Sequence, residues 1–252
     1  MVDPRGSPAV GMDHQLGEAR EVMRHSVGMW AIALLLLPAT PSPFGGWTVI
    51  TVRDLPEYFQ VGTPTKLQFA IRQHGLTLMN DRSPTVSVKR AGGGLLSREQ
   101  RFNAVRAAGA GQYVATVIPE EVGVVEITID ADWYGSDVTL VPMRVVPRRE
   151  KPAPLAAQDR GRQLFVAAGC VTCHAKADPE LGDREVVPVG PVLTGRQFPA
   201  EWLAQKIKDP ASLRVGTGQD AAMPQLGLSE QDIAAVVSYV NYQQRSARAT
   251  ER

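Results

Sequence analysis

Cys170-Val171-Thr172-Cys173-His174 is the stretch of sequence that decides what the second half of this chain is. Two cysteines are separated by two residues and followed at once by a histidine. This spacing is that of an attachment motif for c-type haem, in which each thiol adds to one vinyl group of the porphyrin. The adjacent His174 is then placed to bind the iron through a neutral imidazole nitrogen. The motif occurs once, so it predicts one covalent haem c.

Two other kinds of site also use a pair of closely spaced cysteines. A redox-active dithiol does not need the histidine, and a structural zinc site needs two more ligands at matching spacing, which the chain lacks. Cys170 and Cys173 are the only cysteines of the chain, so neither has another disulfide partner. Both alternatives remain open, but they account for fewer of the five residues.

The residues around the motif predict a small helical domain. Gly161–Gly169 has apolar residues at helical spacing and leads directly into Cys170. After the turn-rich segment Gly190–Gly195, the segment Pro199–Pro210 has the pattern of a short helix closed by proline. Ser229 is placed to cap a last helix. The apolar side of that helix carries Ile233, Val236, Val237 and Val240.

With these features, residues 156–246 resemble a class I cytochrome c domain over its full length. The resemblance rests on the haem motif, the Gly-Pro-x-Leu-x-Gly segment at 190–195, the pair Met223-Pro224, and a closing helix with Tyr239 and Tyr242. It implies an all-α domain that holds one covalent haem c. It also implies that Phe165 and the two tyrosines pack where the first and last helices cross.

Met223 is the candidate for the second axial ligand. His174 is the last histidine of the chain, and Met223 is the only methionine of the predicted haem domain. The resemblance places a ligating thioether at such a Met-Pro pair. Lys206 and Lys208 are possible replacements, and a methionine that merely fills a gap in the core is the ordinary alternative. Coordination by His174 and Met223 fills both axial positions, which favours electron transfer over catalysis. We therefore expect no enzymatic activity.

Two further residues have roles that the resemblance implies. The carbonyl of Pro191 is expected to accept the second ring proton of His174, which would fix the orientation of the imidazole. Trp202 is expected either to donate its indole proton to a haem propionate or to pack in the core.

The segment before the haem domain has a different pattern. Short runs of alternating apolar and polar residues recur between glycine- and proline-rich turns. Seven candidate strands are Trp47–Val52, Lys66–Arg72, Val86–Lys89, Gln100–Arg106, Tyr113–Val117, Val125–Asp130 and Val138–Val146. Seven short strands in about a hundred residues predict an antiparallel sandwich of immunoglobulin type.

The turns of this segment carry a second resemblance. Val61–Pro64, Gly111–Tyr113 and Gly123–Val125 are arranged as in the YtkA-like family of exported β-sandwiches, which the segment resembles. The expected fold is therefore multidomain, with an N-terminal all-β immunoglobulin-like sandwich and a C-terminal all-α class I cytochrome c domain. A fold carries no function by itself, so we expect the sandwich to be a docking module.

Copper binding by the sandwich is the main alternative for this domain. His74, Met79 and Met143 are its only imidazole or soft side chains. A blue-copper centre needs a thiolate, and this domain has no cysteine. A histidine in a turn, like His74, is ordinarily solvated.

The remaining segments divide the chain into parts. Residues 1–45 form a leader whose apolar stretch Met29–Leu37 is too short to span a bilayer and is typical of an export signal, although an uncleaved membrane anchor remains open. Translation that starts at Met23 would give a compact signal. The sandwich is assigned to 46–147, a proline-rich linker to 148–155 and the haem domain to 156–246. Residues 247–252 complete the chain as a tail.

The charge balance argues against one class of partner. The chain has 27 basic and 26 acidic residues, which argues against nucleic acid. The sequence therefore predicts an exported carrier of single electrons, in the periplasm or at the outer face of the plasma membrane. Its partners are expected to be redox proteins of a membrane respiratory or photosynthetic complex. Two alternatives are a haem-based gas sensor or enzyme with an open distal site, and a copper-handling protein with an accessory haem.

Overall fold

The structure of the chain is a computed structural model that describes residues 46–94, 97–182, 184, 186–187, 189–212 and 223–242. The predicted leader and the predicted tail lie outside the described residues, as does the segment that precedes Met223. A β-sheet part (residues 48–146) is followed by a helical part (residues 157–241), as the sequence predicts. Among the described residues, no helix is both long enough and apolar enough to cross a membrane.

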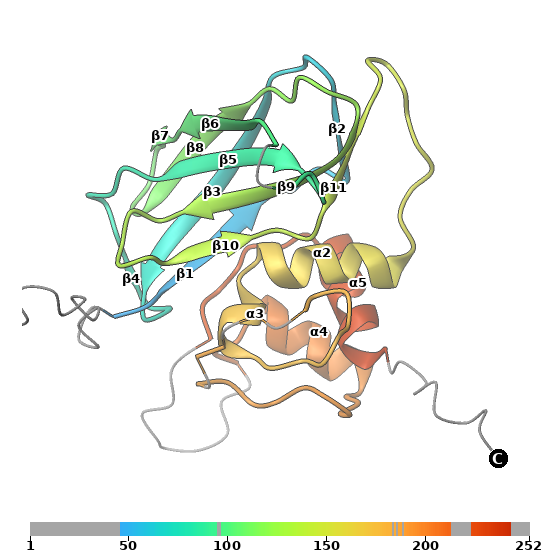
Figure 1. Ribbon diagram of the computed structural model, residues 1–252. Coiled ribbons are helices and arrows are strands. Elements are labelled where there is room, and N and C mark those ends of the chain that lie inside the picture. Colours follow the sequence, from blue (N-terminus) through green and yellow to red (C-terminus); the bar gives the residue numbers. More distant parts are fainter. Residues whose placement is uncertain are drawn as a thin grey trace, which may run out of the picture. The chain divides into compact units, whose positions relative to one another are not determined.

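Two sheets form the β-sheet part (Figure 1). The first contains, in spatial order, β1 (Thr48–Arg53), β3 (Thr65–Gln73), β8 (Gln112–Val117) and β7 (Val105–Arg106), with β4 (Thr77–Leu78) beside β3. The second contains β2 (Tyr58–Gln60), β11 (Met143–Val146), β9 (Gly123–Asp130), β5 (Thr85–Arg90) and β6 (Glu99–Asn103), with β10 (Asp137–Thr139) beside β9. Among these strands, only β2 and β11 pair in parallel.

Alternation along the strands builds the core between the sheets, because successive side chains of a strand point to opposite faces. On β8, Tyr113, Ala115 and Val117 are buried, and on β9 the same holds for Ile127 and Ile129. The predicted inward-facing residues of these two strands are therefore the observed ones.

Two predicted strands are each interrupted in the structure. The run 100–106 breaks at Ala104, whose backbone N–H donates to Pro84 O, so β6 pairs in one sheet and β7 in the other. The run 138–146 breaks before Met143, where Pro142 has no N–H to donate to a ladder. The short strands β2 and β4 were not predicted, because neither is long enough to show alternation.

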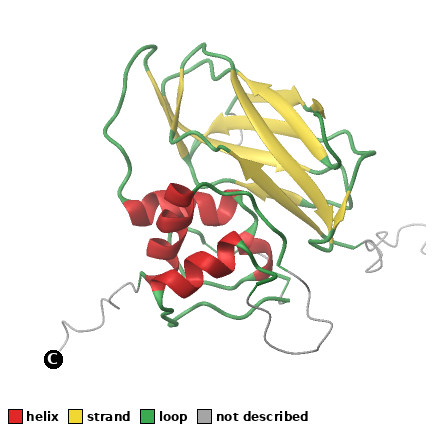
Figure 2. Ribbon diagram, turned by 180° about the vertical axis from the view of Figure 1, so that it is seen from behind, coloured by secondary structure: helices red, strands yellow, loops and turns green. Residues whose placement is uncertain are grey.

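The helical part contains α2 (Ala157–Ala167), α3 (Cys170–Cys173), α4 (Ala200–Lys208) and α5 (Glu230–Asn241) (Figure 2). The first and last long helices cross at Gly161, where a Cβ would lie 2.0 Å from the carbonyl oxygen of Ala235. Phe165 and Tyr239 pack beside this crossing, with ring centroids 5.4 Å apart. The Ser229 hydroxyl accepts a hydrogen bond from the Asp232 N–H at 3.1 Å and so caps α5, as predicted.

The predicted linker contains no helix or strand and is hydrogen-bonded to the sandwich. The Gln60 side chain donates to Glu150 O at 3.0 Å, and Arg144 donates to Ala153 O at 3.3 Å. Since both acceptors are backbone carbonyls, the linker is held largely through its main chain.

The sandwich also contacts the helical part directly. The Thr51 hydroxyl of β1 donates to Ala168 O, and the Arg160 guanidinium of α2 donates to Leu55 O at 2.7 Å. Gly169 packs closely against β1, because a Cβ at this position would lie 2.5 Å from Val49 Cγ1. β1 therefore packs against the segment that leads into the haem motif.

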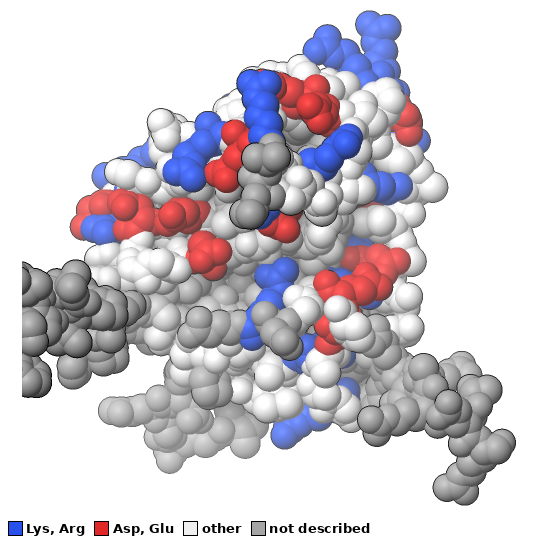
Figure 3. Space-filling model, viewed as in Figure 1, with Lys and Arg blue, Asp and Glu red and all other residues white. Residues whose placement is uncertain are grey.

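Acidic and basic side chains are interspersed on the face of the sandwich seen in Figure 3. Oppositely charged neighbours account for part of this pattern. Lys89 pairs with Glu126 at 2.7 Å, and Arg101 pairs with Glu99 at 3.1 Å.

Candidate haem-binding site

The short helix α3 positions both cysteines. Gly169 precedes it with a φ of 81°, a left-handed conformation that suits glycine and turns the chain sharply between α2 and α3. Cys170 and Cys173 are three residues apart and therefore lie on one side of the single helical turn. Both are partly buried, and they do not form a disulfide. The buried Val171 lies between them in sequence and packs into the core.

Burial keeps the two thiols protonated in the unmodified chain. It raises the pKa of Cys170 to about 12, with a smaller contribution from the neighbouring Cys173, and it also raises the pKa of Cys173. Redox-active dithiols and zinc ligands require the thiolate, which a lowered pKa favours. Within the described ranges, no group of three or more His, Cys, Asp or Glu residues is placed to hold a metal ion. The raised pKa values disfavour a redox-active dithiol.

His174 follows α3 directly, and two residues fix its ring. The Nδ1 atom lies 3.0 Å from Pro191 O. Because a carbonyl oxygen only accepts, this contact is satisfied by the tautomer that carries its proton on Nδ1, which leaves the Nε2 lone pair for a metal. Gly190 packs against the same ring, since a Cβ there would lie 2.5 Å from His174 Cε1. The Gly190 N–H donates to Cys173 O at 3.0 Å, so this loop is tied to the motif itself.

The other predicted site residues lie on separate elements. Met223 is partly buried, precedes α5 and packs against the hydrophobic core. Trp202 on α4 is 41% exposed and stacks on Phe198, with ring centroids 5.7 Å apart. Its role, at a haem propionate or in the core, stays a prediction. Of the alternative axial ligands, the Lys206 ammonium donates to a backbone carbonyl, and Lys208 pairs with Glu230.

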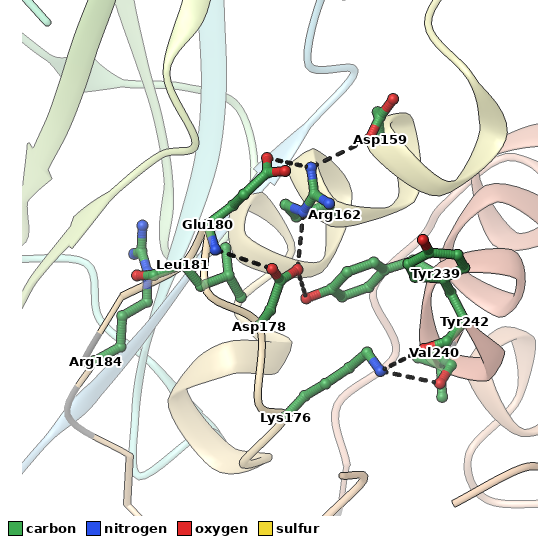
Figure 4. Close-up of polar contacts among 10 residues, drawn as sticks. All are labelled: Asp159, Arg162, Lys176, Asp178, Glu180, Leu181, Arg184, Tyr239, Val240 and Tyr242. Carbon is green, nitrogen blue, oxygen red and sulfur yellow. Dashed lines mark hydrogen bonds and ion pairs between the residues drawn. The ribbon is translucent and has the colours of Figure 1, made fainter. Parts of the chain in front are cut away.

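A buried ionic network, which the sequence analysis missed, holds the segment that follows His174. Figure 4 shows Arg162 of α2 at its centre. Arg162 Nε donates to Asp178 Oδ2 at 2.8 Å, and the Tyr239 hydroxyl of α5 donates to the same oxygen at 2.8 Å. Arg162 Nη1 also donates to Glu180 at 2.7 Å and to Asp159 at 3.2 Å. The network therefore ties this segment to both crossing helices.

The environment of Asp178 explains its charge state. Burial alone would raise the pKa of this carboxyl group, but the hydrogen bonds from Arg162 and Tyr239 outweigh it and lower the pKa below its ordinary value. The Tyr239 hydroxyl has a raised pKa because it is buried and donates to this carboxylate. Asp178 is therefore ionised and Tyr239 neutral at physiological pH.

Lys176 makes a second attachment of the same segment. Its ammonium donates to Val240 O at 3.3 Å and to Tyr242 O at 3.2 Å (Figure 4). Both carbonyls lie at the C-terminal end of α5, where a cation is favourably placed against the helix dipole. Lys176 also lies 5.1 Å from the centroid of the Tyr239 ring.

These residues fit a covalently bound haem c. Two unpaired thiols stand on one helical turn, and the next residue is an imidazole whose Nδ1 already has an acceptor. A glycine stands where any side chain would collide with that imidazole. The donor set is thus complete on the proximal side, next to a segment that the network and Lys176 hold in place.

The comparison with known families agrees with this site. Residues 156–240, about a third of the chain, match the family model described as cytochrome c oxidase, cbb3-type, subunit III. No curated protein matches the chain. The C-terminal domain is therefore a c-type cytochrome domain of class I, a haem protein of electron transfer that binds haem c covalently.

The three candidate copper ligands of the sandwich differ in their surroundings. His74 is exposed, whereas Met79 and Met143 are buried among the apolar side chains of the core. His74 has a φ of 52°, and its ring packs against Trp47 with centroids 5.8 Å apart. The two methionines are therefore packing residues.

Proposed function

We propose that the protein is an exported monohaem cytochrome c that carries single electrons between redox proteins, with His174 and Met223 as the axial ligands. The observation that carries the proposal is the fixed proximal imidazole, with His174 Nδ1 against Pro191 O and Gly190 packed on the ring. A ring held in one orientation suits a permanent ligand, because coordination then needs no rearrangement.

Each residue of the site has a defined task in this proposal. Cys170 and Cys173 anchor the porphyrin, and His174 presents Nε2 to the iron. When bound, the haem supplies a one-electron couple between ferric and ferrous iron. Met223 closes the distal side with a thioether, which favours the ferrous state and leaves no site for exogenous ligands. Arg162, Asp178 and Tyr239 hold the segment after His174, so that little reorganisation accompanies a change of charge.

The family match and the predicted leader support proposals for the partner and for the place of action. The matched family description names a subunit of a cbb3-type cytochrome c oxidase. We propose by analogy that this chain exchanges electrons with a membrane respiratory complex at the outer face of the plasma membrane. The leader would direct the chain there, as a cleaved signal or as an anchor, and the sandwich would serve as a docking module.

A redox titration of the full chain, produced in a host that attaches c-type haem, tests the proposal. We expect a single reversible one-electron wave, a low-spin spectrum in both states and slow binding of carbon monoxide by the reduced protein. Met223→Ala should change this spectrum. Its matched control is Met79→Ala, which removes a methionine buried in the sandwich core and should leave the haem spectrum unchanged. Rapid binding of carbon monoxide by the wild type would instead support the sensor or enzyme alternative.

A further inference from the structure

Part of the outer face of the first sheet is covered by the haem domain. Side chains of directly paired residues share a face of the sheet, so Val49 and Arg72 lie on one face with Thr51 and Arg53. Ile50 and its neighbours of opposite parity point into the sandwich core. On the outer face, Val49 is 2% exposed, Thr51 1% and Arg72 8%.

Arg72 is connected to the haem motif through two hydrogen bonds. Its Nη1 donates to Thr51 Oγ1 at 3.3 Å, and that hydroxyl donates to Ala168 O at 3.3 Å. Ala168 stands two residues before Cys170. The Arg72 guanidinium is therefore linked through Thr51 to the C-terminal end of α2, after which the haem-bearing turn begins.

Arg53 approaches the haem domain at a second place. Its Cζ atom is 3.9 Å from the position that a Cβ of Gly227 would occupy. Gly227 follows the predicted axial ligand Met223 by four residues. The Nε atom of Arg53 is buried and has no hydrogen-bond partner among the described residues. The two arginines thus approach the segments that carry the two predicted axial ligands.

No carboxylate in the described part of the chain neutralises this pair. Within the described ranges, neither guanidinium forms an ion pair. Burial lowers the pKa of Arg72, and the positive charge of Arg53 lowers it further. Burying an arginine without a carboxylate costs stability. Arg162 of the haem domain, by contrast, has three carboxylate partners. A contribution to the stability of the fold therefore does not explain why these two arginines are buried here.

We propose that Arg53 and Arg72 of the sandwich raise the reduction potential of the haem. Ferric haem carries one more positive charge than ferrous haem, so a fixed positive charge nearby destabilises the oxidised state. The effect is larger where the charge is screened from water, because the effective dielectric constant is lower there. The sandwich then tunes the electron carrier as well as supporting it. This inference rests on the proposed electron-transfer function.

The experiment measures the midpoint potential of the haem-loaded full chain in charge variants. Arg72→Gln and Arg53→Gln should each lower the potential, and the double variant should lower it most. Arg72→Lys keeps the charge and should restore most of the wild-type value. Arg106→Gln is the matched control, because it removes the same charge from an exposed residue of β7, at the edge of the same sheet opposite β1. It should leave the potential nearly unchanged.

Two further readouts make the outcome decisive. The near-infrared sulfur-to-iron band should persist in every variant, which separates an electrostatic shift from a lost ligand. If the Arg72→Gln chain does not fold, Arg53→Gln decides, because the Arg53 side chain has no hydrogen bond in the described structure whose loss would strand an acceptor. Folded glutamine variants with the potential of wild type, or with a raised one, would overturn the inference. A wild type without a reversible one-electron wave would overturn the proposed function instead.

Discussion

Replacement of Gly169 by alanine probes the contact between the sandwich and the haem motif. Two penalties apply at this position. The φ of 81° is a left-handed conformation that costs an L-residue about 1–2 kcal/mol. The added Cβ would also lie 2.5 Å from Val49 Cγ1 and 2.7 Å from Ile50 O. Because the second atom belongs to the backbone of β1, the clash is relieved only if the strand or the motif moves.

The size of the effect follows from these two terms. Overpacking of a filled site costs about 1–3 kcal/mol, so Gly169→Ala should lower the free energy of unfolding by about 2–5 kcal/mol in all. Gly182→Ala is the matched control in the same domain. Gly182 has a φ of 62°, but a Cβ there would meet no atom within 4 Å. Only the conformational term of about 1–2 kcal/mol should then remain.

Denaturant unfolding of both haem-loaded variants measures the difference. The two proteins should unfold with the same dependence on denaturant and with different midpoints, because only stability changes. Gly169→Ala should lose more free energy of unfolding than Gly182→Ala. The difference between the two losses measures the clash of the added Cβ with β1. Equal losses in the two variants would refute the reasoning, because they would mean that β1 does not support the haem-bearing turn.

Three further predictions concern the haem site. Gly190→Ala places a Cβ against the ring of His174 and should lower the fraction of low-spin haem in the absorption spectrum without reducing covalent attachment; an unchanged spectrum would argue against the close packing. Met223→Ala should open the sixth position, lower the midpoint potential and permit rapid binding of carbon monoxide, and wild-type behaviour would exclude this residue as a ligand. Asp178→Asn should lower the free energy of unfolding by about 3–5 kcal/mol at neutral pH, because it removes one partner of a buried ion pair. The pKa of Asp178 in the folded state lies below its ordinary value of 3.8, so its contribution is complete above that pH and is lost as the pH falls below it. Unfolding measured across this acidic range should depend less on pH in Asp178→Asn than in wild type, and equal dependence would contradict the assignment.

The parts of the site that are local in sequence could be predicted. Cys170, Cys173 and His174 are contiguous with the helix that carries them, so the motif identifies them without knowledge of the fold. The network of Arg162, Asp178 and Tyr239 could not be found in this way. Its members are 16 and 61 residues apart along the chain, and no spacing rule connects them. A charged residue on the buried side of a helix, as Arg162 is, was the only signal available.

In the sandwich, too, some features could be predicted from the sequence and others could not. Alternation identified the long strands, because a buried face imposes a period of two on each of them. It did not show where a strand leaves one sheet for the other, as at Ala104, since the pattern continues across the break. The contact of Gly169 with β1 was also missed, because it depends on how two domains meet. Arg72 likewise had the pattern of an ordinary outward-facing residue, and Arg53 lay just beyond a predicted strand.

The mass of the intact polypeptide under denaturing conditions tests the central claim most directly. The full chain, produced where c-type haem is attached, should carry the mass of one haem. That mass should be absent when Cys170 and Cys173 are both replaced by serine, and it should remain in Met223→Ala. A wild-type chain without bound haem, or a double serine variant that retains it, would contradict the assignment of residues 170–174 as the haem attachment site.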